Sequence, residues 1–436
     1  MSALSEVVPS ALAKRLAVAV GFFLFLFPPT LQVGGYVLRV NFAVFLSLAI
    51  LCLVFFLQNR VKFVVIVPLA LMVVAFFYAF VVAAMVNFAD LVLVRDLMLG
   101  ACCLLAASYL VHRYLPNSKE RIDVRLLRIV VLAGAFHGLF IVLLVAIPPL
   151  QSFYYSIIPM SKNRVIFVES GTRIIGFTGT GASASAMFSC YFIATLYYML
   201  IPRLSKAGLL VGIATLILTF TAIVLTGRTG IFLVVIGGAL YLLTNFSVKS
   251  ILLWFVGLGS IIGLFFALRM LAMEGTLPAI MQPVLRTFNM FMAEDGSILP
   301  DLNFNTVTYI MENFYFVPQD ARTMFFGSGN FGQNDSMERL NTDVGYIRQL
   351  FGVGIVGSLL AQAFYFWFAY VAVKNWRNPQ CKLLARLLFT LTILWWVMNT
   401  KELQFHTVNG FFQLYCLVGV SLLVLGRRDC PRRGTV

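Results

Sequence analysis

Long apolar runs constrain the fold of this sequence more than any other feature. A helix needs about 20 mostly apolar residues to cross a hydrocarbon layer of roughly 30 Å. About twelve runs approach or exceed that length, at residues 16–36, 38–57, 62–86, 88–110, 126–149, 182–201, 207–226, 229–245, 249–269, 345–373, 384–400 and 408–426. Hydrophobic residues make up 61% of the chain and charged residues 11%, which is far outside the composition of soluble proteins. The sequence therefore predicts an all-α polytopic membrane protein with about twelve transmembrane helices.

The charged residues that flank these runs indicate their orientation. Cytoplasmic loops of membrane proteins are enriched in Lys and Arg. With a cytoplasmic N-terminus, about twice as many of the 32 Lys and Arg residues fall on the cytoplasmic side as on the outside. Both termini are therefore predicted to be cytoplasmic, and topology explains the net charge of +15 without a nucleic-acid partner. The first run lacks a small-residue cleavage pattern, so we expect a retained helix and not a signal peptide.

The longest polar segment separates the ninth run from the tenth. Residues 270–344 hold more than half of the 17 acidic residues and are too long for a plain connector. Apolar residues recur at helical spacing within 280–292 and within 304–314, which predicts two short amphipathic helices on the membrane surface or over the bundle. We therefore divide the chain into nine transmembrane helices (1–269), a large periplasmic loop (270–344), and three transmembrane helices with a basic cytoplasmic tail (345–436).

Common cofactor and metal motifs are absent from the sequence. There is no glycine-rich phosphate loop and no dinucleotide fingerprint, so nucleotide chemistry is not expected. His112, His137 and His406 are far apart and belong to no paired-His motif, and His137 is interpreted as a hydrogen-bonded core residue. The seven cysteines show neither metal-ligand nor disulfide spacing. We therefore predict no metal and no cofactor.

Cationic residues lie at the predicted outer edge of the membrane. Arg173 precedes the sixth run, Arg228 occupies the tight turn between the seventh and eighth runs, and Arg348 follows the large loop. Lys401 and Glu402 form the outside turn after the eleventh run. Each cation alone could be an interfacial anchor. Several of them on separate outside connections favour a shared anionic ligand, because a guanidinium group matches phosphate oxygens.

A second polar group enters the fourth run from the outside. Asp90, Arg95 and Asp96 are close in sequence, and Asp96 lies about 9 Å deeper than Asp90 if the run is helical. Charges at that depth should not face lipid. Two interpretations stay open: these residues line a polar cavity, or they form a buried ion pair that fixes helix packing.

Three glycine-bearing segments carry a resemblance to a known family. They are R-I-I-G-F-T-G-T from Arg173, L-T-G-R-T-G from Leu225, and F-F-G-S-G-N-F-G from Phe325 followed by T-D-V-G-Y-I-R-Q-L-F-G-V-G-I-V-G from Thr342. Together with Lys401 and Glu402, they resemble the O-antigen polymerase and ligase superfamily of bacterial membrane glycosyltransferases. The similarity in architecture covers most of the chain, whereas the motifs cover a small part of it.

The resemblance implies an activity and its participants. The expected reaction transfers a growing glycan from undecaprenyl pyrophosphate to a hydroxyl of another lipid-linked repeat unit, at the periplasmic face of the bacterial inner membrane. The expected ligands are undecaprenyl-pyrophosphate-linked oligosaccharides and membrane lipids. A chain-length regulator and a flippase are candidate protein partners.

The resemblance also suggests roles for individual residues. Those expected to bind the pyrophosphate are Arg173, Arg228, Arg348 and Lys401. Candidates for the base or orienting carboxylate at the acceptor hydroxyl are Asp343, Glu402 and Glu169, and His406 is a less favoured candidate for the base. Those expected to line the cavity are Asp90, Arg95, Asp96, Tyr315, Tyr346 and His406, of which the two tyrosines would stack on sugars.

Two other functions stay open. A ligase that attaches a finished glycan shares the donor chemistry, but the ligase branch is expected to carry a His in the large outside loop, and this loop has none. A transporter or lipid flippase is disfavoured because the chain lacks related halves and its soluble mass lies between the ninth and tenth helices. The sequence therefore favours the polymerase.

Overall fold

The computed structural model describes most of the chain. The described residues are 11–33, 36–58, 64–86, 90–115, 121–160, 173–177, 181–227, 229–273, 315–331, 340, 342, 344–401 and 409–428. The two predicted amphipathic helices within 280–292 and 304–314 lie outside them.

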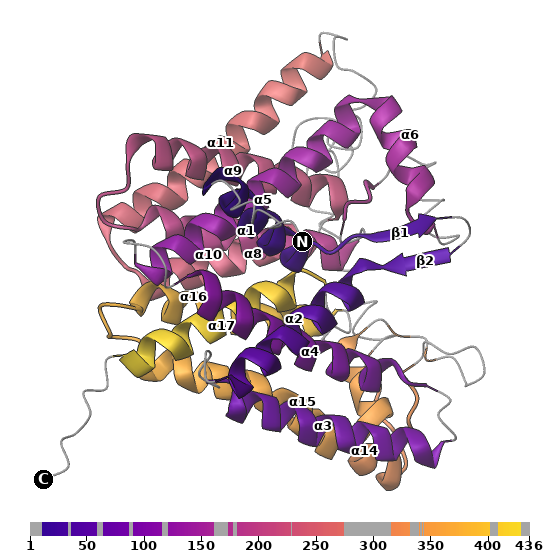
Figure 1. Cartoon of the computed structure of the whole chain (residues 1–436). Helices are drawn as coiled ribbons and strands as arrows, with labels where there is room; N and C mark the ends of the chain where they lie inside the picture. The colour runs from indigo at the N-terminus through magenta and orange to yellow at the C-terminus, as the bar shows by residue number, and fades with distance from the viewer. Residues whose placement is uncertain are drawn as a thin grey trace, which may run out of the picture.

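Helices form almost all of the described structure (Figure 1). In chain order they are α1 (Ala11–Leu26), α2 (Val40–Leu57), α3 (Ile66–Met85), α4 (Val92–Tyr114), α5 (Ile122–Ala146), α6 (Pro148–Ile157), α8 (Ala182–Met199), α9 (Lys206–Thr226), α10 (Thr229–Thr244), α11 (Val248–Met273), α14 (Ala321–Phe326), α15 (Gly345–Lys374), α16 (Lys382–Asn399) and α17 (Phe411–Arg428). Each predicted apolar run overlaps one of these helices, and α6 and α14 are additional.

The first apolar run differs from its predicted form. Helix α1 ends at Leu26, just before Pro28 and Pro29, so the prediction of a helix to residue 36 was wrong. Proline cannot continue a helix and disfavours helical backbone in the residue before it. The chain then forms a small antiparallel hairpin of β1 (Thr30–Val33) and β2 (Tyr36–Arg39), in which Thr30 pairs with Arg39.

Several helices have the length and composition of membrane spans. Among the described residues, six qualify: α3, α4, α5, α9, α15 and α16. Helix α3 also exposes large apolar side chains, including Phe77, Val81 and Met85. Such continuous apolar surface suits lipid and not water. The chain is therefore a helical membrane protein.

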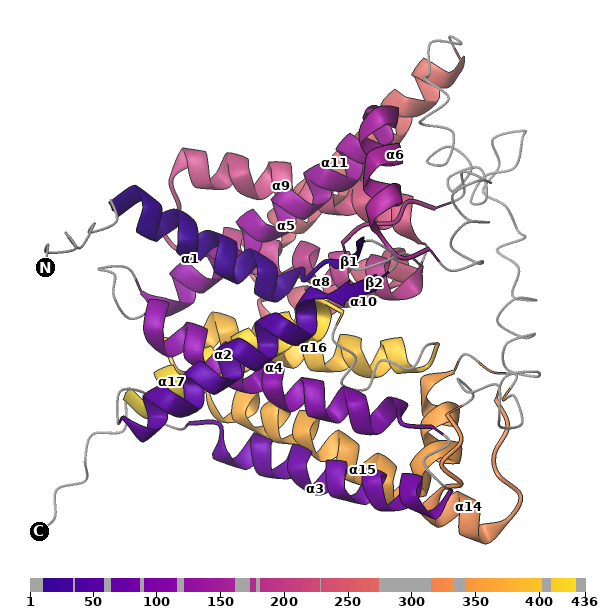
Figure 2. The same cartoon turned by 45° about the vertical axis from the view of Figure 1, so that its right-hand side comes forward.

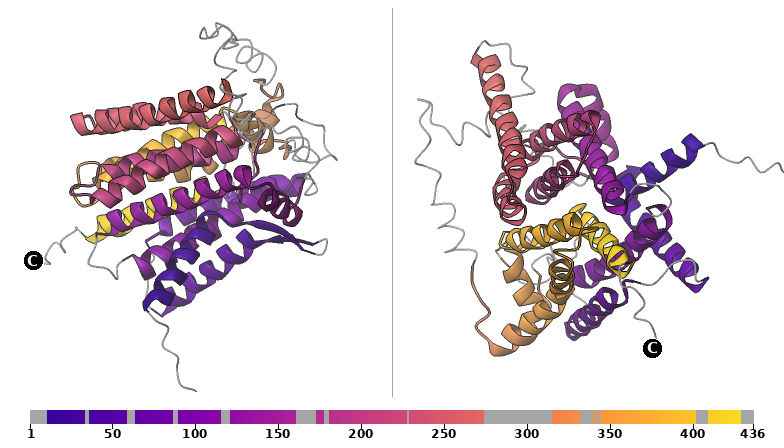
Figure 3. Two further views of the ribbon diagram at one scale, coloured as in Figure 1. Left: turned by 90° about the horizontal axis from the view of Figure 1, so that it is seen from above. Right: turned by 90° about the vertical axis from the view of Figure 1, so that its left-hand side faces the viewer.

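The helices pack in two groups that α16 joins (Figures 1 and 3). One group contains α5, α8, α9 and α10, and the other contains α2, α3, α4, α15 and α17. Helix α8 is buried along nearly its whole length, because α5, α9, α10 and α16 pack around it. Helix α16 packs against α10 on one side and α15 on the other.

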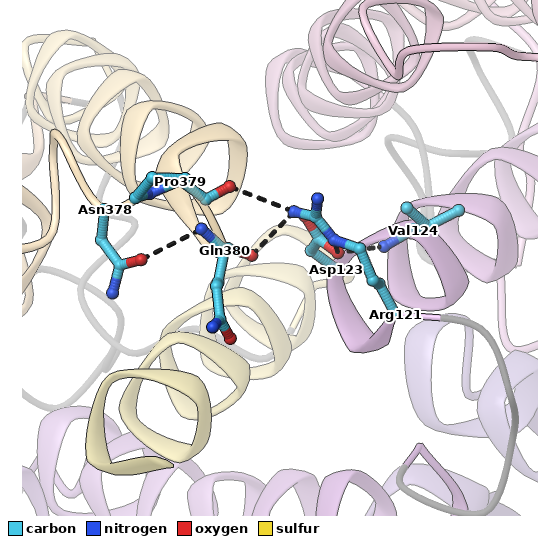
Figure 4. A network of polar contacts seen from close by, with 6 residues as sticks. All are labelled: Arg121, Asp123, Val124, Asn378, Pro379 and Gln380. Atoms are coloured by element: carbon cyan, nitrogen blue, oxygen red, sulfur yellow. Dashed lines mark hydrogen bonds and ion pairs between the residues drawn. The ribbon is translucent and has the colours of Figure 1, made fainter. Parts of the chain in front are cut away.

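The bundle has two distinct ends. Figure 2 shows that α1 begins and α17 finishes at one end, here called the tail end. The hairpin β1–β2, α6 and α14 lie at the opposite end, here called the α14 end. At the tail end, Arg121 pairs with the buried Asp123 at 2.7 Å and donates to the carbonyl oxygens of Pro379 and Gln380 (Figure 4). This network fixes the start of α5 to the turn between α15 and α16.

Candidate functional site

Two of the glycine-bearing segments meet at the α14 end. The backbone N–H of Ile174 donates to the carbonyl oxygen of Leu225 at 2.9 Å, and the N–H of Gly181 donates to that of Thr226 at 3.0 Å. A Cβ atom at Gly227 would lie only 2.7 Å from the carbonyl oxygen of Gly181, so this close approach requires glycine. The segment that contains Arg173 is therefore held directly against the end of α9.

The same contacts bring the starts of α8 and α10 together. The N–H of Gly230 donates to Ser185 Oγ at 3.2 Å, and Ser189 Oγ donates to the carbonyl oxygen of Gly230 at 2.8 Å. The first N–H groups of a helix carry a partial positive charge. Two helix N-termini side by side favour an anion. Arg173 adds a full positive charge beside them: its Nη1 lies 3.3 Å from the position that a Cβ atom on Gly181 would take.

Lys401 adds a second cation at this place. Its Nζ donates to Thr229 Oγ1 at 3.1 Å, which joins the turn after α16 to the start of α10. Tyr315 donates through its hydroxyl to the carbonyl oxygen of Thr400 at 2.5 Å. The site thus combines two cations, two helix N-termini and an aromatic ring.

The third glycine-bearing segment folds back on itself. The N–H groups of Ser328 and Gly329 donate to the carbonyl oxygens of Phe351 and Gly352 at 2.7 and 2.9 Å. These carbonyl groups are free to accept because α15 is interrupted at Gly354, where φ is +65°. The two halves of the segment, which the sequence separates, therefore form one backbone-to-backbone contact.

Arg348 and Tyr346 lie on the first turns of α15. Arg348 Nε donates to the carbonyl oxygen of Thr342 at 2.6 Å, and the Tyr346 hydroxyl donates to that of Trp396 at 3.0 Å. Tyr346 therefore contacts the last turns of α16, the helix that Lys401 follows. The structure places Arg348 on the α15 side of the α14 end, and Arg173 with Lys401 on the α8 and α10 side.

The polar group at the start of α4 has structural partners. Arg95 Nε and Nη2 both lie 2.9 Å from Asp96 Oδ1. The Arg95 side chain is 45% exposed and both residues lie on α4, so this pair is not the buried ion pair of the second interpretation above and does not join two helices. Asp90 is buried, and its two carboxylate oxygens accept from the N–H groups of Val92 and Phe331 at 3.0 and 3.2 Å. Asp90 thus ties the third glycine-bearing segment to α4.

We expect Asp90→Ala to destabilise the protein by about 1 to 3 kcal/mol, because the buried N–H of Phe331 would lose its acceptor. Asp90→Asn keeps one carbonyl acceptor and should cost less. The measurement is the apparent melting temperature of each purified variant in the same detergent. Equal melting temperatures for Asp90→Ala and the unmodified protein would contradict this structural role.

His137 was predicted to be a hydrogen-bonded core residue. It is fully buried, with its ring 4.3 Å from that of Phe27 and 4.7 Å from that of Phe188, but neither ring nitrogen has a hydrogen-bond partner among the described residues. A Cβ atom at Gly176 would lie 2.9 Å from its Nε2. The burial was predicted correctly, and in the described part of the chain aromatic rings, not hydrogen-bond partners, surround the imidazole.

Other predicted residues lie outside the described part of the chain. They are Glu169, Arg228, Asp343, Glu402 and His406. In the described part, no group of His, Cys, Asp and Glu side chains could hold a metal ion. The sequence analysis did not identify Ser185, Ser189 and Thr229, whose contacts depend on pairing between segments far apart in the chain.

Comparison with known proteins adds no assignment, because neither the protein-family models nor the curated proteins contain a match to this sequence.

Proposed function

We propose that this chain is a membrane glycosyltransferase that polymerises undecaprenyl-pyrophosphate-linked oligosaccharide repeat units at the periplasmic face of the bacterial inner membrane. One observation carries the proposal: the cation-bearing glycine segments, which are far apart in sequence, gather at the α14 end of the bundle. The contact between Ile174 and Leu225 joins two of them, and Lys401 reaches Thr229 beside them.

The proposed reaction needs positive charge more than any other group. The acceptor hydroxyl oxygen attacks the anomeric carbon of the donor glycan, and the bond from that carbon to the pyrophosphate oxygen breaks. The bonding electron pair leaves with the pyrophosphate, and the hydroxyl proton passes to a base. Arg173, Lys401 and the N-termini of α8 and α10 are fixed before the reaction, so they can stabilise the charge that develops on the leaving group.

The base is proposed from the sequence alone. Asp343 is preferred because it precedes α15 and the cation Arg348, and Glu402 and Glu169 are the alternatives. Tyr315 and Tyr346 present phenol rings at the same end of the bundle, where they could stack on sugar rings. A chain-length regulator and a flippase would act on the same lipid-linked glycans.

The polysaccharide ladder of a deletion strain tests this function. Loss of a polymerase should leave a single repeat unit attached to its final acceptor, because attachment does not depend on polymerisation. Loss of a ligase should remove even that unit. An unchanged ladder in a strain that makes the polysaccharide would reject both activities.

The proposal includes a topology of about twelve crossings with both termini in the cytoplasm. A reporter that is active only outside the cytoplasm should be active when it is fused after Asn313, and silent when it is fused after Lys119. The expectation rests on the distribution of Lys and Arg and on the position of the large loop. The reverse pattern would place the α14 end in the cytoplasm and overturn the site proposed above.

A further inference from the structure

We propose that residues 315–331 form a re-entrant segment, in which α14 is embedded in the outer part of the membrane and contacts lipid directly. This segment belongs to the predicted periplasmic loop, and neither of the two amphipathic helices predicted for that loop includes its residues. The proposal does not depend on the glycosyltransferase activity.

The first argument is the exposed apolar surface of the segment. Phe316, Val317, Met324, Phe325 and Phe326 are all exposed, and the last two expose 49% and 56% of their surface. An aqueous loop would hide such a cluster, because contiguous apolar patches on soluble surfaces are uncommon. Arg322 is exposed on the same helix, and an arginine at an interface can extend its charged group to water while its neighbours stay in lipid.

The second argument is the position of the segment along α3. The Tyr78 hydroxyl donates to the carbonyl oxygen of Phe326 at 3.2 Å. Tyr78 is seven residues before the end of α3 at Met85, which corresponds to about 10 Å along the helix. Phe326 therefore lies beside the outer third of a helix whose exposed side chains, such as Phe77 and Val81, face lipid. Figure 2 shows α14 next to the corresponding end of α3.

The third argument is the hydrogen bonding of the non-helical backbone after α14. At membrane depth, an irregular backbone is stable only if the protein itself satisfies its polar groups. The N–H of Gly327 donates to Thr323, those of Ser328 and Gly329 donate to the broken turn of α15, and that of Phe331 donates to Asp90. Four N–H groups of the backbone following α14 thus have acceptors within the protein, as an environment without water requires.

The fourth argument is that the segment is fixed in place. A Cβ atom at Gly327 would overlap the backbone of Gly352, and one at Gly354 would overlap the backbone of Phe325. The α14 segment and α15 therefore contact each other without intervening side chains. Helix α14 therefore cannot leave the membrane independently of α15. Its apolar surface continues the lipid-facing surface of α3. We therefore infer that the acyl chains of the bilayer cover both surfaces.

The experiment places p-cyanophenylalanine at Phe325 in the full chain, reconstituted in phospholipid nanodiscs. This residue is nearly the same shape as Phe, and its nitrile stretching frequency reports hydration. The control is the same substitution at Phe77, which is similarly exposed on the membrane-spanning α3. We expect the frequency at 325 to match that at 77 and to differ from that of the free amino acid in buffer. A frequency at 325 equal to that of the hydrated amino acid would overturn the proposal.

A second measurement identifies the neighbour of α14. Phe325 is replaced by p-benzoylphenylalanine, and the nanodiscs are irradiated and analysed by mass spectrometry. An adduct with the mass of one phospholipid is expected, as at Phe77. A covalent dimer of the chain at position 325, with no lipid adduct, would show that a second copy and not lipid covers α14, and would overturn the proposal.

Discussion

Arg173→Ala is expected to lower polymer formation at least about 100-fold, because fixed donors to a developing anion contribute that much in a site that excludes water. The guanidinium group lies beside the joined starts of α8 and α10, where two helix termini already favour negative charge. Arg173→Lys should recover only part of the activity, since an ammonium group keeps the charge but not the bidentate geometry. The measurement is the rate at which the purified variant polymerises lipid-linked repeat units.

The matched control is Arg377→Ala, which removes the same charge from an exposed position at the tail end. It should leave the rate nearly unchanged. Both variants should be present in the membrane at the level of the unmodified protein, so that a difference in rate reports chemistry and not expression. Full activity of Arg173→Ala would remove Arg173 from the proposed anion site.

Hydropathy alone predicted most of the helical architecture. The run at 182–201 became α8 (Ala182–Met199), and the run at 345–373 became α15 (Gly345–Lys374), because apolar length is the dominant requirement for a membrane helix. The errors occurred where local chemistry outweighs hydropathy. Pro28 and Pro29 ended α1 early although the sequence around them is apolar. Helix α14 was missed because six helical residues are too few to produce a periodic pattern.

The candidate site was predictable in its residue types but not in its contacts. Arg173 and Lys401 were identified because a charge at a membrane edge is conspicuous in an apolar sequence. That Lys401 would reach Thr229 follows only from the packing of α16 against α10. The same holds for the glycines. The sequence shows that Gly181 and Gly227 are present, but only the fold shows that they contact each other.

Asp90 shows how one pattern can have two explanations. The sequence grouped Asp90 with Arg95 and Asp96 and left open a polar cavity or a buried ion pair, whereas the buried Asp90 accepts hydrogen bonds from backbone N–H groups. Its acceptance of a hydrogen bond from Phe331, 241 positions later in the chain, could not be inferred from neighbouring residues. Long-range pairing of this kind carries no local signal, so a single sequence cannot specify it.

Gly354→Ala is expected to cost about 2 to 5 kcal/mol of stability and to abolish activity. The residue has φ of +65°, which disfavours any side chain, and an added Cβ atom would overlap the backbone of Phe325. To relieve the overlap, the α14 segment would have to move away from α15, which would break the hydrogen bonds of Ser328 and Gly329. Arg348 and Tyr346 precede this break on α15, so their positions would change as well.

The control for Gly354→Ala is Gly259→Ala. Gly259 lies inside α11, and an added Cβ atom there would meet no atom within 4 Å. Alanine favours a helix over glycine by roughly 1 kcal/mol, so this variant should be at least as stable as the unmodified protein. Both changes add the same single methyl group, and only the fold distinguishes them. Equal melting temperatures for the two variants in the same detergent would show that the α14 segment does not rest against the broken turn of α15, and the membrane insertion proposed for α14 would lose its anchor.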